Sequence, residues 1–71
     1  NIQTYNNKID IYSTGVLLYE LFEYKTYIPS GRNRWFWAPR IVKKLVKNYM
    51  LCEDPRDRYS AYMLLNILNH Y

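Results

Sequence analysis

The chain has 71 residues, of which 49% are hydrophobic and 18% aromatic, and its formal net charge at pH 7 is +4. A chain of this length forms at most one domain, because it buries only about 60% of the surface that its unfolded form exposes. No run of about 18 apolar residues exists, which excludes a membrane-spanning helix, and the first residues lack a secretory signal. The lone cysteine, Cys52, predicts a reducing, intracellular and cytoplasmic location.

The apolar content is high for so small a body, and this bears on whether the chain is complete. Apolar surface that a small core cannot bury must be covered by something else. The chain also begins with Asn1 and not with Met. We therefore expect a fragment of a larger fold, with residues missing upstream.

The first predicted helix covers residues 8–24, with Asn6 or Asn7 as its N-cap. Asp10 falls in the first turn, where the helix dipole favours a negative charge. Apolar residues surround most of the circumference, which predicts a central helix that is buried on nearly all sides. Gly15 costs about 1 kcal/mol relative to Ala inside a helix, so we expect a neighbouring segment to approach closely at this position.

Residues 25–38 are predicted to form an irregular loop. Pro29 and Gly31 favour turns, and the cluster Trp35-Phe36-Trp37 is expected to anchor the loop onto the core.

The second predicted helix covers residues 39–51, with Pro39 in its first turn. Its residues divide into two faces, which is typical of an amphipathic helix at the surface. The apolar face comprises Ile41, Val42, Leu45, Val46, Tyr49 and Met50, and the polar face comprises Arg40, Lys43, Lys44, Lys47 and Asn48.

A polar loop over residues 52–59 precedes the third predicted helix, residues 60–71. Ser60 is a favourable N-cap. The apolar face of this helix comprises Met63, Leu64, Ile67, Leu68 and Tyr71. Because the strand signal is weak throughout, the sequence predicts an all-α chain of three helices.

Two segments of the sequence resemble the C-terminal lobe of protein kinases, the serine/threonine type above the tyrosine type. The first matches the central helix that kinases call αF, and it contains Asp10, Tyr12-Ser13, Gly15-Val16 and Leu18-Tyr19-Glu20-Leu21. The second matches the loop between the last two helices, αH and αI, and it contains Asp54-Pro55, Arg58 and Ser60-Ala61. The resemblance implies a three-helix fragment of a kinase-like lobe, in which the irregular loop replaces most of the helix called αG.

The resemblance also implies roles for individual residues. Asp10 would anchor the catalytic loop by accepting backbone hydrogen bonds, the alternative being an ordinary capping acid at the surface. Gly15 would be a close-packing site. Arg58 would tether the activation segment through a glutamate that falls just before Asn1, the alternative being a solvated loop arginine. Glu20 would contact a basic residue of the substrate, as in some kinases, although pairing with a nearby cation such as Lys25 is favoured.

The function implied is that of a segment of an ATP-dependent protein kinase. The sequence contains neither the Gly-rich loop nor the His-Arg-Asp and Asp-Phe-Gly motifs of these enzymes. ATP and Mg²⁺ would therefore bind outside this segment, which would supply no catalytic, cofactor or metal residue itself. Its expected partners are the remainder of the kinase domain and a protein substrate. A non-catalytic kinase-like interaction module is the alternative.

A basic stretch of the sequence supports a further, less favoured interpretation, a helical segment that binds nucleic acid. No acid lies between Glu23 and Glu53, and the basic residues of this stretch flank an aromatic cluster, a composition found at nucleic-acid interfaces. The residues concerned are Lys25, Arg32, Arg34, Arg40, Lys43, Lys44 and Lys47. A solvated helix face explains them more simply, so we do not expect nucleic-acid binding. His70 has no second ligand at suitable spacing, which argues against a metal site.

Overall fold

The computed structural model describes residues 8–70, and all regular secondary structure in this part of the chain is helical. It contains the α-helices α2 (Lys8–Glu23), α3 (Arg40–Leu45) and α4 (Ala61–Asn69), the π-helix η1 (Val46–Met50) and the 3-10 helix η2 (Pro55–Asp57). The prediction of an all-α chain is thus confirmed for residues 8–70, which contain no strand. The predicted N-cap at Asn6 or Asn7 and the predicted contact of Tyr71 lie outside the described residues.

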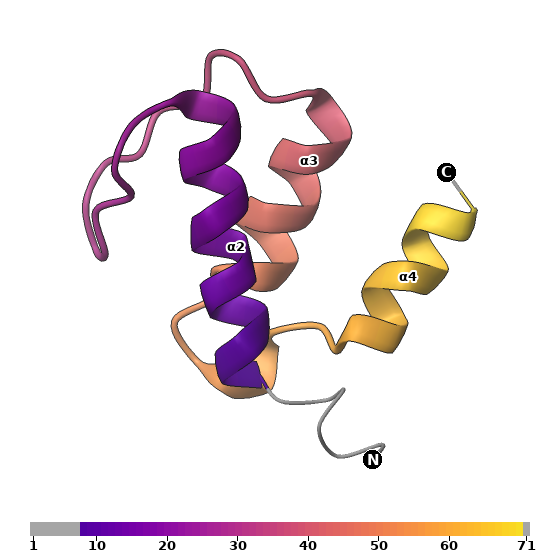
Figure 1. The fold of residues 1–71 in the computed structure, drawn as a ribbon. Coiled ribbons are helices and arrows are strands. Elements are labelled where there is room, and N and C mark those ends of the chain that lie inside the picture. The colour runs from indigo at the N-terminus through magenta and orange to yellow at the C-terminus, as the bar shows by residue number, and fades with distance from the viewer. Residues whose placement is uncertain (1–7, 71) are drawn as a thin grey trace.

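Helix α2 packs along one side against η1, and α3 lies beside it (Figure 1). Its buried residues are Ile11, Gly15, Tyr19 and Glu23, which recur every four positions and therefore form a single stripe. On the other side of the helix, Leu17 is 63% exposed and Leu21 is 62% exposed. The prediction of a helix buried on nearly all sides is therefore wrong for the described chain, which is too short to cover a second face.

The second predicted helix is divided into two kinds of helix. Pro39 is the N-cap of α3, and the α-helix gives way to η1 at Val46. The wider turn ends where the N–H of Leu51 donates to the carbonyl oxygen of Val46 at 2.9 Å. The two predicted faces are nevertheless present: Leu45, Val46 and Met50 are buried, whereas the basic side chains are exposed.

Helix α4 stands apart from the α2–α3 pair and contributes little to the core (Figure 1). Ser60 is its N-cap as predicted, because its Oγ accepts a hydrogen bond from the N–H of Met63 at 3.2 Å. Leu64 alone in this helix is buried, and it joins a core cluster with Ile11, Leu45, Val46 and Met50. Other members of the predicted apolar face remain accessible: Met63 is 45% exposed and Leu68 is 50% exposed.

The loop between α2 and α3 is only partly anchored by its aromatic residues. The ring of Trp35 packs edge to face against the ring of Tyr19, with centroids 4.8 Å apart. Phe36 and Trp37 are 66% and 72% exposed, so the predicted aromatic anchor is wrong for these two residues. Their backbone N–H groups, and not their rings, face α2, where both donate to Glu23.

Candidate functional site

Arg58 joins the start of α2 to the loop that precedes α4. Its guanidinium donates three hydrogen bonds to backbone carbonyl oxygens: 2.6 Å to Cys52, 3.0 Å to Lys8 and 3.1 Å to Glu53. The guanidinium carbon also lies 4.6 Å from the centroid of the Tyr12 ring, a cation–π contact. In the described part of the chain no carboxylate pairs with Arg58.

A second hydrogen bond runs in the opposite direction between the same residues. The Nζ of Lys8 donates to the carbonyl oxygen of Arg58 at 2.6 Å. Lys8 and Arg58 therefore hold the start of α2 against the loop that precedes α4, although they lie 50 positions apart. We call this pair the Arg58–Lys8 link. A half-buried arginine with these partners differs from the solvated loop arginine considered above.

Gly15 lies where α2 meets the end of η1. A Cβ added at this position would lie 2.9 Å from Cδ2 of Leu51 and 3.1 Å from Cβ of Met50. Both distances are shorter than ordinary van der Waals contact between carbon atoms. The close approach of these two residues thus explains a glycine inside a helix.

The Asp10 side chain takes no part in these contacts. It is exposed in the first turn of α2, and its carboxylate makes no hydrogen bond or ion pair with any residue from 8 to 70. The Arg58–Lys8 link begins two residues earlier, at Lys8, and uses a backbone carbonyl instead of the Asp10 carboxylate. The structure therefore places Asp10 and Arg58 near the same end of α2 without bringing their charges together.

The carboxylate of Glu20 accepts a hydrogen bond from the loop that follows α2. Its Oε2 accepts a hydrogen bond from the N–H of Tyr27 at 2.9 Å. The predicted partner Lys25 lies instead over the ring of Phe36, with Nζ 5.0 Å from the centroid. The favoured alternative was therefore wrong about the partner, because the backbone of the loop, and not a neighbouring cation, meets this carboxylate.

Glu23 is the residue that sequence reasoning missed. It is 3% exposed, and its carboxylate accepts backbone hydrogen bonds from Phe36 at 2.6 Å, Trp37 at 2.8 Å and Ala38 at 2.6 Å. Burial alone would raise the pKa of Glu23, but these three hydrogen bonds, helped by the charge of Lys25, hold the pKa below its ordinary value. The sequence carried a signal: an acid in the last turn of a helix opposes the helix dipole and therefore calls for donors from elsewhere.

Three aromatic rings complete the attachment of the loop. Tyr19 is 1% exposed, and its hydroxyl donates to the carbonyl oxygen of Arg34 at 3.0 Å. Its ring contacts the edges of Tyr27 and Trp35, with centroids 5.6 and 4.8 Å away. Burial is the largest cause that raises the pKa of Tyr27 to about 12, so its hydroxyl stays neutral at physiological pH.

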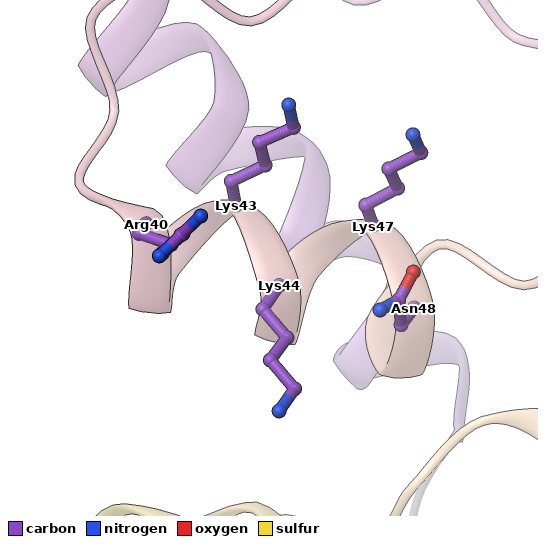
Figure 2. A pocket seen from close by; sticks show the side chains of 5 residues that line it. All are labelled: Arg40, Lys43, Lys44, Lys47 and Asn48. Carbon is purple, nitrogen blue, oxygen red and sulfur yellow. The ribbon is translucent and has the colours of Figure 1, made fainter. Parts of the chain in front are cut away.

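The polar face of α3 and η1 borders a shallow hollow of about 480 Å³. Figure 2 shows its five lining residues, Arg40, Lys43, Lys44, Lys47 and Asn48. In the same figure the side chains of Lys43 and Lys47 extend to one side of the helix and that of Lys44 to the other. The hollow is thus lined by four cations and one amide, without an acidic side chain.

Residues 8–70 contain no group of three His, Cys, Asp or Glu side chains that could hold a metal ion. The Nδ1 of His70 lies 2.8 Å from the carbonyl oxygen of Asn66, at the end of α4. None of the helices described is long and apolar enough to cross a membrane.

No protein-family model matches the chain, and neither does any curated protein or solved structure. Its function is therefore inferred from its residues and their geometry.

Proposed function

We propose that the chain is the C-terminal segment of an ATP-dependent protein kinase of the serine/threonine type, and that it supports the catalytic loop and the activation segment. The observation that carries this proposal is the Arg58–Lys8 link. It brings the Asp-Pro-x-x-Arg segment, which resembles the αH–αI loop, to the first turn of the helix that resembles αF.

The position of Arg58 supports the proposal because the resemblance specifies it independently. The glutamate expected to pair with this arginine precedes the αF helix, so the guanidinium has to reach the start of that helix. In this chain it reaches the carbonyl oxygen of Lys8, the first residue of α2. The described contacts occupy three of its five N–H donors, which leaves two for a carboxylate.

The uncovered side of α2 also supports the proposal. Leu17 and Leu21 are exposed there, and full burial of a leucine side chain stabilises a fold by about 1.5–3 kcal/mol. Asp10, exposed in the first turn, is available to accept backbone N–H groups from another segment. The remainder of a kinase domain would cover this apolar surface and would use the carboxylate.

ATP and Mg²⁺ belong elsewhere in this proposal. Mg²⁺ is held in kinases by carboxylate and amide oxygens together with the phosphates of the nucleotide. Residues 8–70 offer no cluster of acidic side chains for it, and the sequence has no Gly-rich loop for the phosphates. The residues present therefore do not fit the nucleotide or its metal, and we assign no step of phosphoryl transfer to them.

The exposed apolar surface favours a second candidate, a non-catalytic kinase-like module that binds a partner protein. Contiguous exposed apolar residues mark interaction sites on soluble proteins. On α4, Tyr62 is 78% exposed and Leu65 is 56% exposed. The two candidates differ in whether the complete translated product transfers phosphate.

The test uses the complete product of the reading frame and measures transfer of the terminal phosphate of ATP to serine and threonine residues of a general protein substrate. We expect transfer by the unmodified protein and a loss on the order of a hundredfold in Asp10→Asn, because the catalytic loop would lose its anchor. Asp57→Asn is the matched control, since Asp57 is another exposed acid. Absence of transfer by the complete product would favour the interaction module, and equal activity of Asp10→Asn and the control would remove the anchor role.

A further inference from the structure

The four cations of the hollow lack acidic partners. Only one ion pair occurs among residues 8–70, between Arg56 and Asp54, and it lies outside the hollow. Arg40, Lys43, Lys44 and Lys47 therefore carry positive charge that no described acid neutralises. No side-chain hydrogen bond within the described chain holds any of them in place either, so all four heads are available to a ligand.

These charges oppose the stability of the helix that carries them. Residues three or four positions apart on a helix are neighbours, and like charges at that spacing repel each other. Arg40 stands in this relation to Lys43 and Lys44, and Lys47 stands in it to the same two lysines. Arg40 in the first turn of α3 also opposes the helix dipole, and that turn contains no acid, whereas the dipole favours Lys43 and Lys44 in the last turn of α3 and Lys47 in the last turn of η1. The mutual repulsion of the four cations is a cost that folding does not explain.

We propose that this hollow binds an acidic segment of a partner protein, rich in Asp and Glu or phosphorylated. Bound carboxylates or phosphates would neutralise the four cations and remove their mutual repulsion. From Arg40 to Lys47 the helix rises by roughly 10 Å. An extended peptide covers that distance with about three residues, so three or four consecutive acidic residues match the length of the cluster.

The dimensions of the hollow favour a short acidic peptide over a nucleic acid. Affinity for nucleic acids depends on neutralising many phosphates along a continuous basic track. The hollow contains four cations on one short helical segment, and Arg32 and Arg34 of the preceding loop do not line it. Lys43 and Lys47 extend to the same side of the helix (Figure 2), so one short peptide can meet both. This proposal does not depend on the kinase assignment.

The test measures binding of the chain to a fluorescein-labelled peptide that carries a run of glutamates, with the corresponding glutamine peptide as the ligand control. Two double variants are compared. One carries Lys43→Gln and Lys47→Gln, and the other carries Arg32→Gln and Arg34→Gln. Each pair removes two positive charges, but only the first pair lies in the hollow. We expect the first pair to weaken binding by roughly tenfold and the second by less than about twofold. Binding should also fall steeply between about 50 and 200 mM salt.

A stability measurement distinguishes a lost site from a lost fold. Because the lysines repel each other, Lys43→Gln with Lys47→Gln should leave the melting temperature unchanged or raise it while binding falls. Three results would overturn the proposal: no binding of the glutamate peptide at low salt, equal losses in the two variants, or tighter binding of a single-stranded oligonucleotide or an anionic lipid vesicle at matched charge concentration.

Discussion

An acid near each end of α2, Asp10 at the start and Glu23 at the end, meets a different environment. At the C-terminal end, Glu23 is buried and accepts three backbone hydrogen bonds from residues 36–38. At the N-terminal end, Asp10 is exposed and has no partner among residues 8–70. Glu23 therefore holds the described fold together, whereas the Asp10 carboxylate contributes no contact to residues 8–70.

This difference shows how the start of α2 is held although the carboxylate of Asp10 makes no contact with residues 8–70. At the start of α2, cationic side chains donate to backbone carbonyl oxygens: the guanidinium of Arg58 to Lys8 and the ammonium of Lys8 to Arg58. At the end of α2, the carboxylate of Glu23 accepts hydrogen bonds from backbone N–H groups. Substitutions at the two ends should consequently separate residues that hold this chain together from residues that serve a partner.

The largest loss of stability of this chain is expected for Glu23→Gln. The amide keeps one acceptor oxygen and places an NH₂ group against a backbone N–H, so at least one buried donor loses its partner. We expect the melting temperature, measured by circular dichroism, to fall on the order of 10 °C. Glu53→Gln at an exposed position is the control. A change no larger than that of the control would show that the carboxylate does not hold the loop.

The melting temperature of Glu23→Gln should also depend less on pH in the acid range than that of the unmodified chain. The pKa of Glu23 is lower in the folded chain than its ordinary value of 4.5, so the ionised carboxylate stabilises the fold above that pH. The contribution is lost as the pH falls through the folded-state pKa. Melting temperatures of the unmodified chain should therefore fall below about pH 4.5, and those of Glu23→Gln should fall less. The remaining slope should reflect Asp54, whose pKa is lowered by its hydrogen bonds with Arg56.

Arg58→Met should have the next largest effect. It removes the guanidinium that joins the carbonyl oxygens of Cys52, Lys8 and Glu53, and we expect a loss of about 1–2 kcal/mol in the free energy of unfolding. Arg58→Lys keeps the charge but offers a single donor head, so it should restore only part of the loss. Urea denaturation gives the values. Arg56→Gln is the control, because among residues 8–70 that exposed side chain pairs only with Asp54, and an equal loss there would contradict a special role for Arg58.

A smaller loss is expected for Gly15→Ala. The helix gains about 1 kcal/mol in propensity, but the new Cβ would lie 2.9 Å from Leu51 Cδ2 and 3.1 Å from Met50 Cβ, which costs about 1–3 kcal/mol of overpacking. We expect a net loss of about 1 kcal/mol in urea denaturation. In a background of Leu51→Ala, Gly15→Ala should cost less, because the Leu51 side-chain atoms nearest to the new Cβ are absent. A stabilising Gly15→Ala would disprove the close approach.

The smallest effect is expected for Asp10→Asn in this chain. An exposed acid without a partner among the described residues contributes little, so the free energy of unfolding should change by no more than about 0.5 kcal/mol. The same substitution in the complete product should impair phosphoryl transfer if Asp10 anchors a catalytic loop. A large loss of stability in the 71-residue chain would show that Asp10 has a partner within it, and would abolish the contrast with Glu23.

The sequence by itself determined the all-α class, the helices and the two faces of the second helix. Helical spacing of apolar residues and the capping tendency of Ser60 are local properties that a sequence displays directly. Gly15 was also readable, because a glycine inside a helix costs free energy and so indicates a close neighbour.

Only the tertiary structure decided which helix faces are covered and which polar groups meet. Leu17 and Leu21 have the apolar character of core residues, yet no described segment reaches them. The partners of Arg58 and Glu23 are backbone atoms, which every residue possesses, so no pattern of side chains could identify them. Contacts of this kind depend on how the chain returns to α2 after a loop, and that is a property of the whole fold.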